Sequence, residues 1–309
     1  MNSPQLDTKA QAVRLTPPRE KRRSPLRAAH LFLLPYVILL ILFGIVPGLY
    51  ALIISFAKFV GGRPQYFQAG LDNYITAYTD FRVLDSFSNV LSYLLISIPI
   101  GVIGVIFISL WLHAKPGKIS TAFRTIFFIP GAFAGPALVL LAFFMFSPTT
   151  SPFGVLLTAM GFQNSAEVTL RDNYPVLFTI LGFFAGAGGW VSIFYGALDG
   201  ISKEVMEAAI MDGCNTFQTA YLVKLPLIRT YLAYMVMLTV AGNVQVFAEP
   251  QLFGSKYWSP NQIGYAFAFE IGNFGASAAI SLLMVTVGLF AATLIIKYSG
   301  FYQTDATAS

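Results

Sequence analysis

Hydrogen-bonding side chains interrupt the apolar run 227–247 at helical spacing. One face of a helix over this run would carry, in order, Thr239, Gly242, Asn243 and Val246. Gln245 lies beside that face, and Glu249 follows one turn later. Polar groups at membrane depth are costly unless they face a partner or a water-filled cavity. These residues therefore predict either hydrogen bonding to a polar solute or helix-to-helix packing, for which Thr, Gly and Asn are also common.

A second apolar run, 174–198, contains a glycine-rich stretch. A face without side-chain bulk would be formed by Gly182, Ala185, Gly186 and Gly189. Such a face suits close helix packing or a pore wall that is open to a sizeable ligand. Trp190 follows directly and offers a surface for stacking, although packing and membrane-interface roles are also common for tryptophan.

The sequence lacks the residue sets that catalysis and metal binding require. His30 and His113 are the only histidines, and neither has a second ligand at the spacing of a metal site. No Ser-His-Asp set can be assembled inside the apolar runs. Gly117-Lys118 is similar to the end of a phosphate loop, but Ile119 replaces the required Ser or Thr. We therefore expect no catalytic residues, no bound metal and no cofactor in this chain.

The polar segment 202–226 separates two apolar runs that are each long enough to span a bilayer. Its pattern predicts a helix, a glycine turn and a second helix. The cap and turn residues are, in order, Ser202, Gly213, Asn215 and Gln218. Pro226 is expected to end the second helix, because the residue before a proline disfavours helical geometry.

The first helix of this segment has a small-to-apolar stripe at Met206, Ala209, Ile210 and Gly213. Charged residues surround the stripe: Lys203, Glu204, Glu207 and Asp212. Ala208 and Ala209 have small side chains, so another protein could approach the helix backbone closely. The same periodicity is also typical of an amphipathic helix at the lipid headgroups.

Composition places the chain among integral membrane proteins. Of its 309 residues, 56% are hydrophobic and 11% are charged, with a mean hydropathy of +0.68. Cys214 is the single cysteine, so no intramolecular disulfide is possible. The net charge of +5 does not indicate nucleic-acid binding, because the basic residues cluster at the ends of apolar runs.

We predict an all-α integral membrane protein with six transmembrane helices and a cytoplasmic helix-turn-helix loop. The predicted spans are 31–56, 87–112, 123–146, 174–198, 227–247 and 274–297, with a kink at Pro47 in the first. They form a domain over residues 31–298. A disordered basic tail is expected over residues 1–30 and a short C-terminal tail over 299–309.

Charge counting predicts the orientation of these spans. With both termini in the cytoplasm, fourteen of the nineteen Lys and Arg residues lie on the inner side and five on the outer side. Because basic residues accumulate in cytoplasmic loops, the asymmetry favours this topology. The outer loops are then 58–86, 147–173 and 248–273.

The segment 202–226 resembles a known family. Its Glu207-Ala208-Ala209, followed by Gly213 and by Val223-x-Leu225-Pro226, is similar to the EAA loop of ABC-importer permeases, which usually have Ile at the position of Val223. The stretches LFLLP, GLDNYITAYTD, FFIPGAFAGPAL and FGASAAIS resemble the maltose-type, first-permease branch that imports carbohydrates. The resemblance covers nearly all of residues 31–297.

The resemblance implies roles for two sets of residues. In the family, the EAA loop is a coupling loop that docks on a cytoplasmic ATPase subunit. The residues expected to take part in this docking are Glu204, Glu207, Ala208, Ala209, Asp212, Gly213 and Pro226. For the solute pathway, the resemblance implies the positions Thr239, Gly242, Asn243 and Val246. The residue types and spacing described above add Gln245, Gly186, Gly189 and Trp190 to the expected pathway.

The resemblance also implies partners. They are a second, related permease, two ATP-binding cassette subunits that hold ATP and Mg, an extracytoplasmic solute-binding protein, and membrane lipid. The complex would lie in the inner or plasma membrane as a multi-pass assembly that transports a sugar or related solute by alternating access.

Two other classes fit the composition less well. An ion-coupled secondary transporter would be expected to carry ionisable residues in mid-span or an internal repeat, and the sequence has neither. An integral membrane enzyme would need a catalytic set, which is missing.

Overall fold

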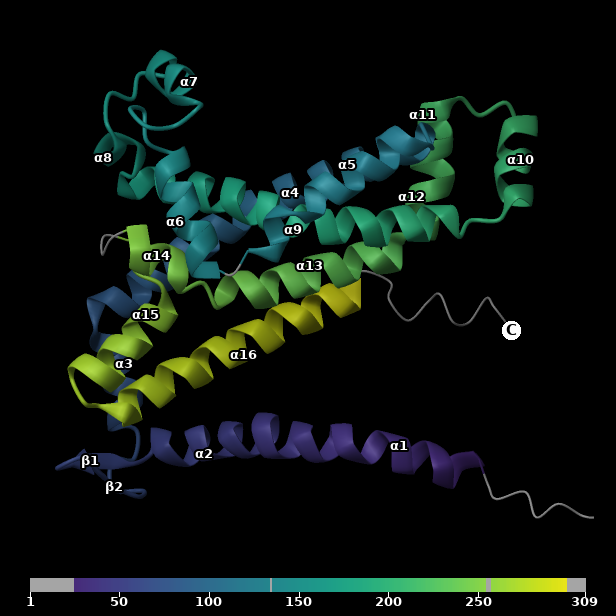
Figure 1. Cartoon of the computed structure of the whole chain (residues 1–309). Coiled ribbons are helices and arrows are strands. Elements are labelled where there is room, and N and C mark those ends of the chain that lie inside the picture. The colour runs from purple at the N-terminus through teal and green to yellow at the C-terminus, as the bar shows by residue number, and fades with distance from the viewer. Residues whose placement is uncertain (1–24, 134, 254–256, 299–309) are drawn as a thin grey trace, which may run out of the picture. The chain divides into compact units, whose positions relative to one another are not determined.

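The computed structural model describes residues 25–133, 135–253 and 257–298. The expected C-terminal tail and residues 1–24 of the expected basic tail lie outside the described residues, as does part of the loop after the fifth predicted span. The chain divides into two compact units, Met1–Leu49 and Tyr50–Ser309. Figure 1 shows the individual helices and their labels.

The first apolar helix consists of α1 (Pro25–Leu40), the π-helix η1 (Ile41–Ile45) and α2 (Val46–Ser55), and α2 crosses the boundary between the two units. Helix therefore begins before the predicted start at residue 31. The π turn lies directly before Pro47, and the Val46 amide donates to the Ile41 carbonyl. In a π-helical turn, an amide donates to the carbonyl five residues earlier, and this wider turn accommodates a proline without breaking the helix.

Four more helices are long and apolar enough to cross a membrane. They are α4 (Phe81–Ala114), α9 (Tyr174–Asp199), the span Arg229–Leu252 and α16 (Phe274–Tyr298). The span Arg229–Leu252 contains α13 (Arg229–Val244) and most of α14 (Ala248–Phe253). With the first helix, the described part of the chain has five such helices, which confirms the predicted all-α membrane fold.

Helix α4 begins six residues before the predicted span because Asp80 caps it. The Asp80 carboxylate accepts a hydrogen bond from the Arg82 amide at 2.9 Å and forms an ion pair with the Arg82 guanidinium at 2.7 Å. This side-chain hydrogen bond lowers the pKa of the Asp80 carboxyl. The cap therefore holds its charge at neutral pH and satisfies an amide at the helix start.

The expectation of one continuous helix over 123–146 is wrong. The structure has α5 (Lys118–Phe128), the 3-10 turn η2 (Pro130–Ala132) and α6 (Gly135–Met145). A proline and a glycine in η2 weaken continuous helix bonding, and a second glycine-proline pair begins α6. The six-span count therefore depends on whether α5 and α6 cross the membrane as one broken span, and it stays a prediction.

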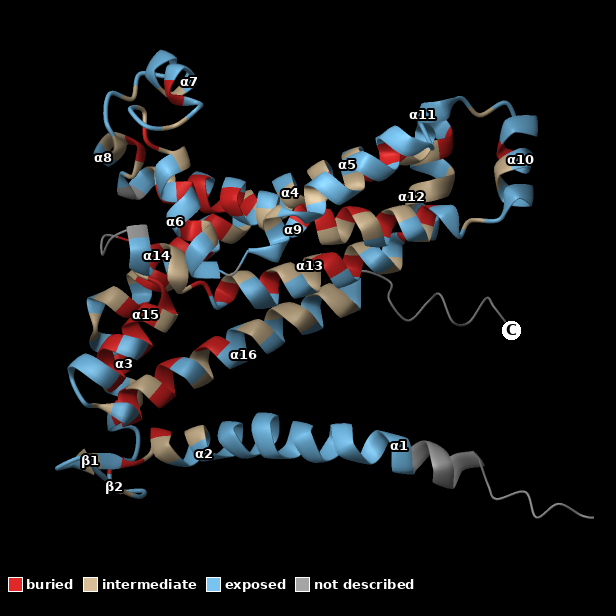
Figure 2. Cartoon of the chain, viewed as in Figure 1, coloured by how far each residue is buried: buried red, intermediate tan, exposed pale blue. Residues whose placement is uncertain are grey.

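Helix α9 packs closely against α4 and α5. A Cβ added at Gly188 would meet the Phe127 carbonyl, and one added at Gly131 would lie 2.6 Å from the Ala185 carbonyl. On the α4 side, Val191 and Phe194 of α9 are fully buried in a shared apolar cluster. Figure 2 shows buried residues along α9, whereas much of α16 is exposed. Exposed apolar side chains on membrane helices suit lipid or a partner subunit.

Short elements cover the ends of these helices. They are β1 (Lys58–Val60), β2 (Arg63–Gln65), α3 (Asp72–Thr79), α7 (Gly154–Ala159), α8 (Ser165–Val168), η3 (Arg171–Asn173), α15 (Pro260–Tyr265) and η5 (Ala266–Glu270). The two strands form an antiparallel hairpin with Phe59 opposite Pro64. Near α15, the Tyr257 hydroxyl donates to the Asn89 carbonyl, which ties the chain after α14 to α4.

We predict that Gly188→Ala destabilises the protein, because its new methyl group would meet the α5 backbone. Overpacking of this kind costs roughly 1–3 kcal/mol. The melting temperature of the purified protein in detergent should therefore fall.

Gly189→Ala is the matched control, since a Cβ at Gly189 has nothing within 4 Å. Equal melting temperatures for the two variants would contradict the packing of α5 on α9.

Candidate solute cavity and coupling segment

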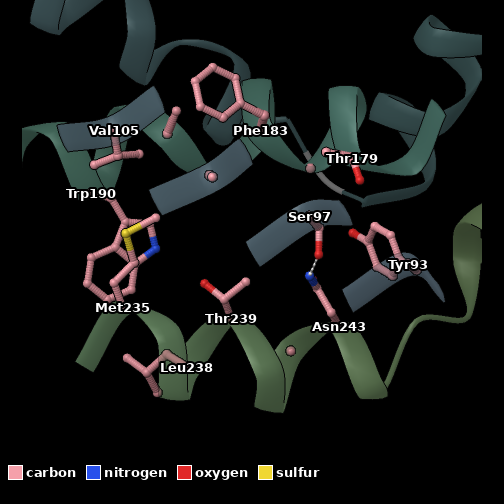
Figure 3. A pocket seen from close by; sticks show the side chains of 15 residues that line it. Tyr93, Ser97, Val105, Thr179, Phe183, Trp190, Met235, Leu238, Thr239 and Asn243 are labelled. Carbon is pink, nitrogen blue, oxygen red and sulfur yellow. Dashed lines mark hydrogen bonds between the residues drawn. The ribbon is translucent and has the colours of Figure 1, made fainter. Parts of the chain in front are cut away.

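A cavity of about 220 Å³ lies between α4, α9 and α13. Figure 3 shows the side chains that line it. From α13 they are Met235, Leu238, Thr239, Gly242 and Asn243, and from α9 they are Thr179, Gly182, Phe183, Gly186, Ala187 and Trp190. From α4 they are Tyr93, Ser97, Gly101 and Val105. The predicted polar face of α13 and part of the glycine face of α9 therefore meet in one cavity.

Asn243 is held in place by a side chain from α4. Its Nδ2 donates to the Ser97 Oγ at 3.0 Å (Figure 3). Thr239 lies one turn earlier on the same face of α13, and Gly242 leaves backbone bare between them. The α13 wall thus presents an amide, a hydroxyl and an open stretch of backbone.

The α9 wall owes its shape to glycine. A Cβ at Gly186 would meet nothing within 4 Å, so this position opens onto free space. A Cβ at Gly182 would lie 3.2 Å from the Tyr93 hydroxyl, so this position allows the close approach of α4. The Trp190 indole, shown in Figure 3 beside Met235, supplies an aromatic surface.

The α4 wall was not predicted from the sequence. Tyr93, Ser97, Gly101 and Val105 recur every four residues, so they lie along one side of the helix. This polar and small stripe is the signal that could have identified the wall. The cavity depends on it, because Ser97 is the hydrogen-bond partner of Asn243.

Three of the predicted pathway residues do not line this cavity. They are Gly189, Gln245 and Val246. Helix α13 ends at Val244, so helical spacing no longer places later residues on the same face. The Gln245 amide donates back to the Ala241 carbonyl at 3.1 Å, and Val246 is buried in an apolar cluster with Val90.

The chemistry of the cavity is neutral hydrogen bonding combined with aromatic contact. None of its described lining residues is Asp, Glu, Lys or Arg. The polar groups come from amide, hydroxyl, phenol and indole side chains, all of which can bond hydroxyl groups of a solute. Such a lining can bind an uncharged, hydroxyl-rich molecule and offers no counter-ion for a charged one.

The segment between α9 and α13 contains the expected helix, glycine turn and helix. Helix α10 (Lys203–Met211) ends in a Schellman motif, in which the Cys214 amide donates to the Ala209 carbonyl and the Gly213 amide to the Ile210 carbonyl, both at 3.0 Å. Gly213 has a φ of 80°, in the left-handed region that favours glycine. The Asn215–Gln218 capping box is present at the start of α11 (Thr216–Gln218).

The prediction that Pro226 ends the second helix is wrong. Helix continues from α11 through the π-helix η4 (Thr219–Lys224) into α12 (Leu225–Leu227). The Leu225 amide donates to the Ala220 carbonyl, five residues back, just as happens before Pro47. The wider turn lets the chain pass the proline, and the helix ends before Ile228.

Helix α10 presents an exposed surface, and Figure 1 shows it set apart from the main helices of its unit. Glu204, Glu207 and Ala208 are exposed, whereas Ala209 is buried. Met211 is 87% exposed. Ser202 occupies the N-cap position, but its side chain accepts no capping hydrogen bond from the backbone. The backbone amide of Glu204 and the Ser202 hydroxyl instead bind the Glu204 carboxylate and lower its pKa.

Comparisons with known proteins agree with these features. No family model matches the chain. It is 25% identical over 290 residues to the arabinooligosaccharides transport system permease protein AraP of Bacillus subtilis, which covers 90% of each chain. It is 26% identical over 282 residues to the multiple sugar-binding transport system permease protein MsmF of Streptococcus mutans, covering 88% of this chain and 95% of the relative.

Solved structures show the same fold. A chain of a bacterial ABC transporter involved in the import of the acidic polysaccharide alginate matches with a TM-score of 0.73 at 17% identity, covering 88% of this chain and 95% of that one. A second match, also with a TM-score of 0.73, comes from an alginate ABC transporter in complex with an alginate pentasaccharide-bound periplasmic protein. The resemblance inferred from the motifs is therefore confirmed, and this multi-pass membrane protein is a homologue of the permease subunits of sugar ABC transporters.

Proposed function

We propose that the chain forms half of the translocation pathway of an ABC importer for a neutral saccharide. The observation that carries this proposal is the cavity between α4, α9 and α13, where Asn243, Thr239 and Trp190 come together without any charged side chain. Amide and hydroxyl groups bond sugar hydroxyls, and an aromatic face packs on a sugar ring. Relatives named for arabinooligosaccharide and multiple-sugar transport support a saccharide as the solute.

The other half of the pathway comes from a second permease. Exposed apolar side chains along α16, such as Leu289 and Phe290 at 65% each, provide surface for a partner subunit or for lipid. An extracytoplasmic solute-binding protein delivers the saccharide, as the periplasmic protein in the matched complex suggests.

ATP hydrolysis takes place in two partner ATP-binding cassette subunits. The Gly117-Lys118 pair lacks the rest of a phosphate loop, so this chain has no nucleotide site of that type. Helix α10 docks on one ATPase through its exposed acidic residues and the small exposed side chain of Ala208. Closure of the ATPases around ATP then moves the coupling segment and opens the pathway to the outside.

The excess of Lys and Arg near 1–30, 115–124, 203–229 and 297 supports cytoplasmic termini and a cytoplasmic coupling segment. This orientation places α10 on the side where ATP is available. It also places the β-hairpin, α3, α7 and α8 on the side that meets the solute-binding protein.

We predict that Asn243→Ala lowers uptake while the transporter still assembles. Loss of the amide leaves a solute hydroxyl unpaired, at a cost of roughly 1–3 kcal/mol, which corresponds to a loss of about five- to 150-fold in transport-competent binding. Uptake per assembled complex should be measured together with complex yield and melting temperature.

Gln245→Ala is the matched control, because this amide lies directly after the end of α13 and outside the cavity. Normal uptake per complex in Asn243→Ala, together with a lower yield, would reject the solute role and leave Asn243 as a packing residue.

We predict that Glu207→Lys and Gly213→Pro each separate the ATPase from the membrane subunits. The first reverses an exposed charge, and the second removes both the left-handed turn and its amide hydrogen bond. A loss of about 1.4 kcal/mol at the interface lowers ATPase co-purification roughly tenfold.

Lys118→Glu is a suitable control, since it also reverses an exposed charge but lies outside α10. Co-purification and uptake at wild-type levels in the Glu207 and Gly213 variants would refute the docking role of α10.

We predict that a cysteine at position 165 reacts with a membrane-impermeant reagent in intact cells and that one at position 203 does not. Both are introduced after Cys214→Ser, and total labelling is measured in permeabilised cells. The reverse pattern would overturn the orientation without affecting the fold.

A further inference from the structure

One contact joins the coupling segment to the end of α4. The Lys224 Nζ, at the end of η4, lies 3.2 Å from the His113 Nδ1, in the last turn of α4. Both residues are half-buried. Neither residue belongs to the predicted coupling set or to the solute cavity.

The surroundings of this contact come from two further elements. The Tyr195 ring of α9 packs edge-on against the His113 ring at a centroid distance of 5.6 Å. The Arg124 guanidinium of α5 lies over the same Tyr195 ring at 3.9 Å. At the end of α9, the Leu198 backbone forms a hydrogen bond with the imidazole, and the Asp199 carboxylate interacts with it electrostatically. The ring therefore interacts with a cation from η4 and with the negative end of α9.

The geometry requires a neutral imidazole. A lysine ammonium has three donors and no acceptor, so its N–H donates to the lone pair of the His113 Nδ1. Protonation of the ring would remove that lone pair and place two cations 3.2 Å apart. The protonated ring would then favour Asp199 and the α9 carbonyl end, and Lys224 would leave.

The second helix of the segment exposes several large apolar side chains. Phe217 is 78% exposed, Tyr221 is 62% exposed and Leu222 is 59% exposed. The Lys224–His113 hydrogen bond restrains this helix at the α4 end, in addition to the apolar packing of Leu225 on the cluster that contains Leu112. Its loss would loosen the coupling segment relative to α4.

We propose that His113 and Lys224 are positioning residues that form a proton-sensitive link between the coupling segment and the membrane helices. The link holds the segment in register with α4 when the ring is neutral and releases it as the cytoplasm becomes acidic. This role rests on the proposed function of α10 in coupling, but the contact itself can be tested separately.

The test is hydrogen exchange of residues 216–224 in the transporter purified through a tag on this chain and placed in lipid nanodiscs. Protection factors, which correct for the intrinsic pH dependence of exchange, are compared between about pH 8 and about pH 4.5, so that the acidic value lies well below the ordinary imidazole pKa of about 6.5. We expect the wild-type protection of this segment to fall roughly three- to tenfold on acidification, as for the loss of one hydrogen bond of ordinary net strength.

Variants separate the link from a general effect of pH. His113→Gln keeps an acceptor that does not titrate, so the segment should stay protected at both pH values. In Lys224→Met, which lacks the donor, residues 216–224 should be weakly protected at both pH values. Lys118→Met, which removes an exposed charge outside the link, should behave as the wild type.

An unchanged pH dependence in His113→Gln, or full protection in Lys224→Met, would overturn the inference. ATPase content of the same preparations is measured in parallel. If no ATPase subunit co-purifies, the proposed coupling function is refuted. The exchange data would still show whether the His113–Lys224 contact depends on pH.

Discussion

The close approach of α9 to its neighbours is the constraint on which the rest of the structure depends. Gly188 lies against the α5 backbone and Gly182 against Tyr93 of α4, so α9 has little freedom on either side. Gly186, between them, opens onto the cavity. A helix packed on two sides and bare at one point forms a rigid wall without filling the space that a solute needs.

This rigid frame determines the energetics of the cavity. Asn243 donates one Nδ2 hydrogen to Ser97 across the cavity wall, which fixes the orientation of the amide. An amide has a second N–H and a carbonyl oxygen with which to bond a solute hydroxyl. Binding of moderate strength suits a transport pathway, since a solute that is held too tightly would not leave. The aromatic surface of Trp190 then contributes contact area without adding a charge.

Local chemistry made much of the fold predictable. The Gly213 turn and the Asn215–Gln218 cap follow from residue preferences that act within a few positions, and both are present. The long apolar runs likewise predicted α9 and α16 to within a residue or two. The family resemblance, which rests on fixed spacings, was also confirmed.

What could not be predicted depends on bonding and packing between distant segments. The π turns before Pro47 and Pro226 let helices pass prolines that normally end them, and nothing in residue preference shows such turns. The break between α5 and α6 accompanies the packing of α5 on Gly188. Ser97 was not predicted as a site residue, because its contact with Asn243 depends on the packing of α4 beside α13. Val246 was predicted but does not line the cavity, because α13 ends at Val244. The sequence indicated the polar face but not the wall opposite.

ATP-driven uptake in reconstituted liposomes tests the central claim most directly. The complex purified through a tag on this chain is reconstituted with its solute-binding protein, and entry of a panel of labelled neutral oligosaccharides is measured with ionophores that collapse all ion gradients. We predict uptake that requires ATP on the side of the coupling segment and that continues without any gradient. Uptake that stops when the gradients are collapsed, or that proceeds without ATP, would contradict the account.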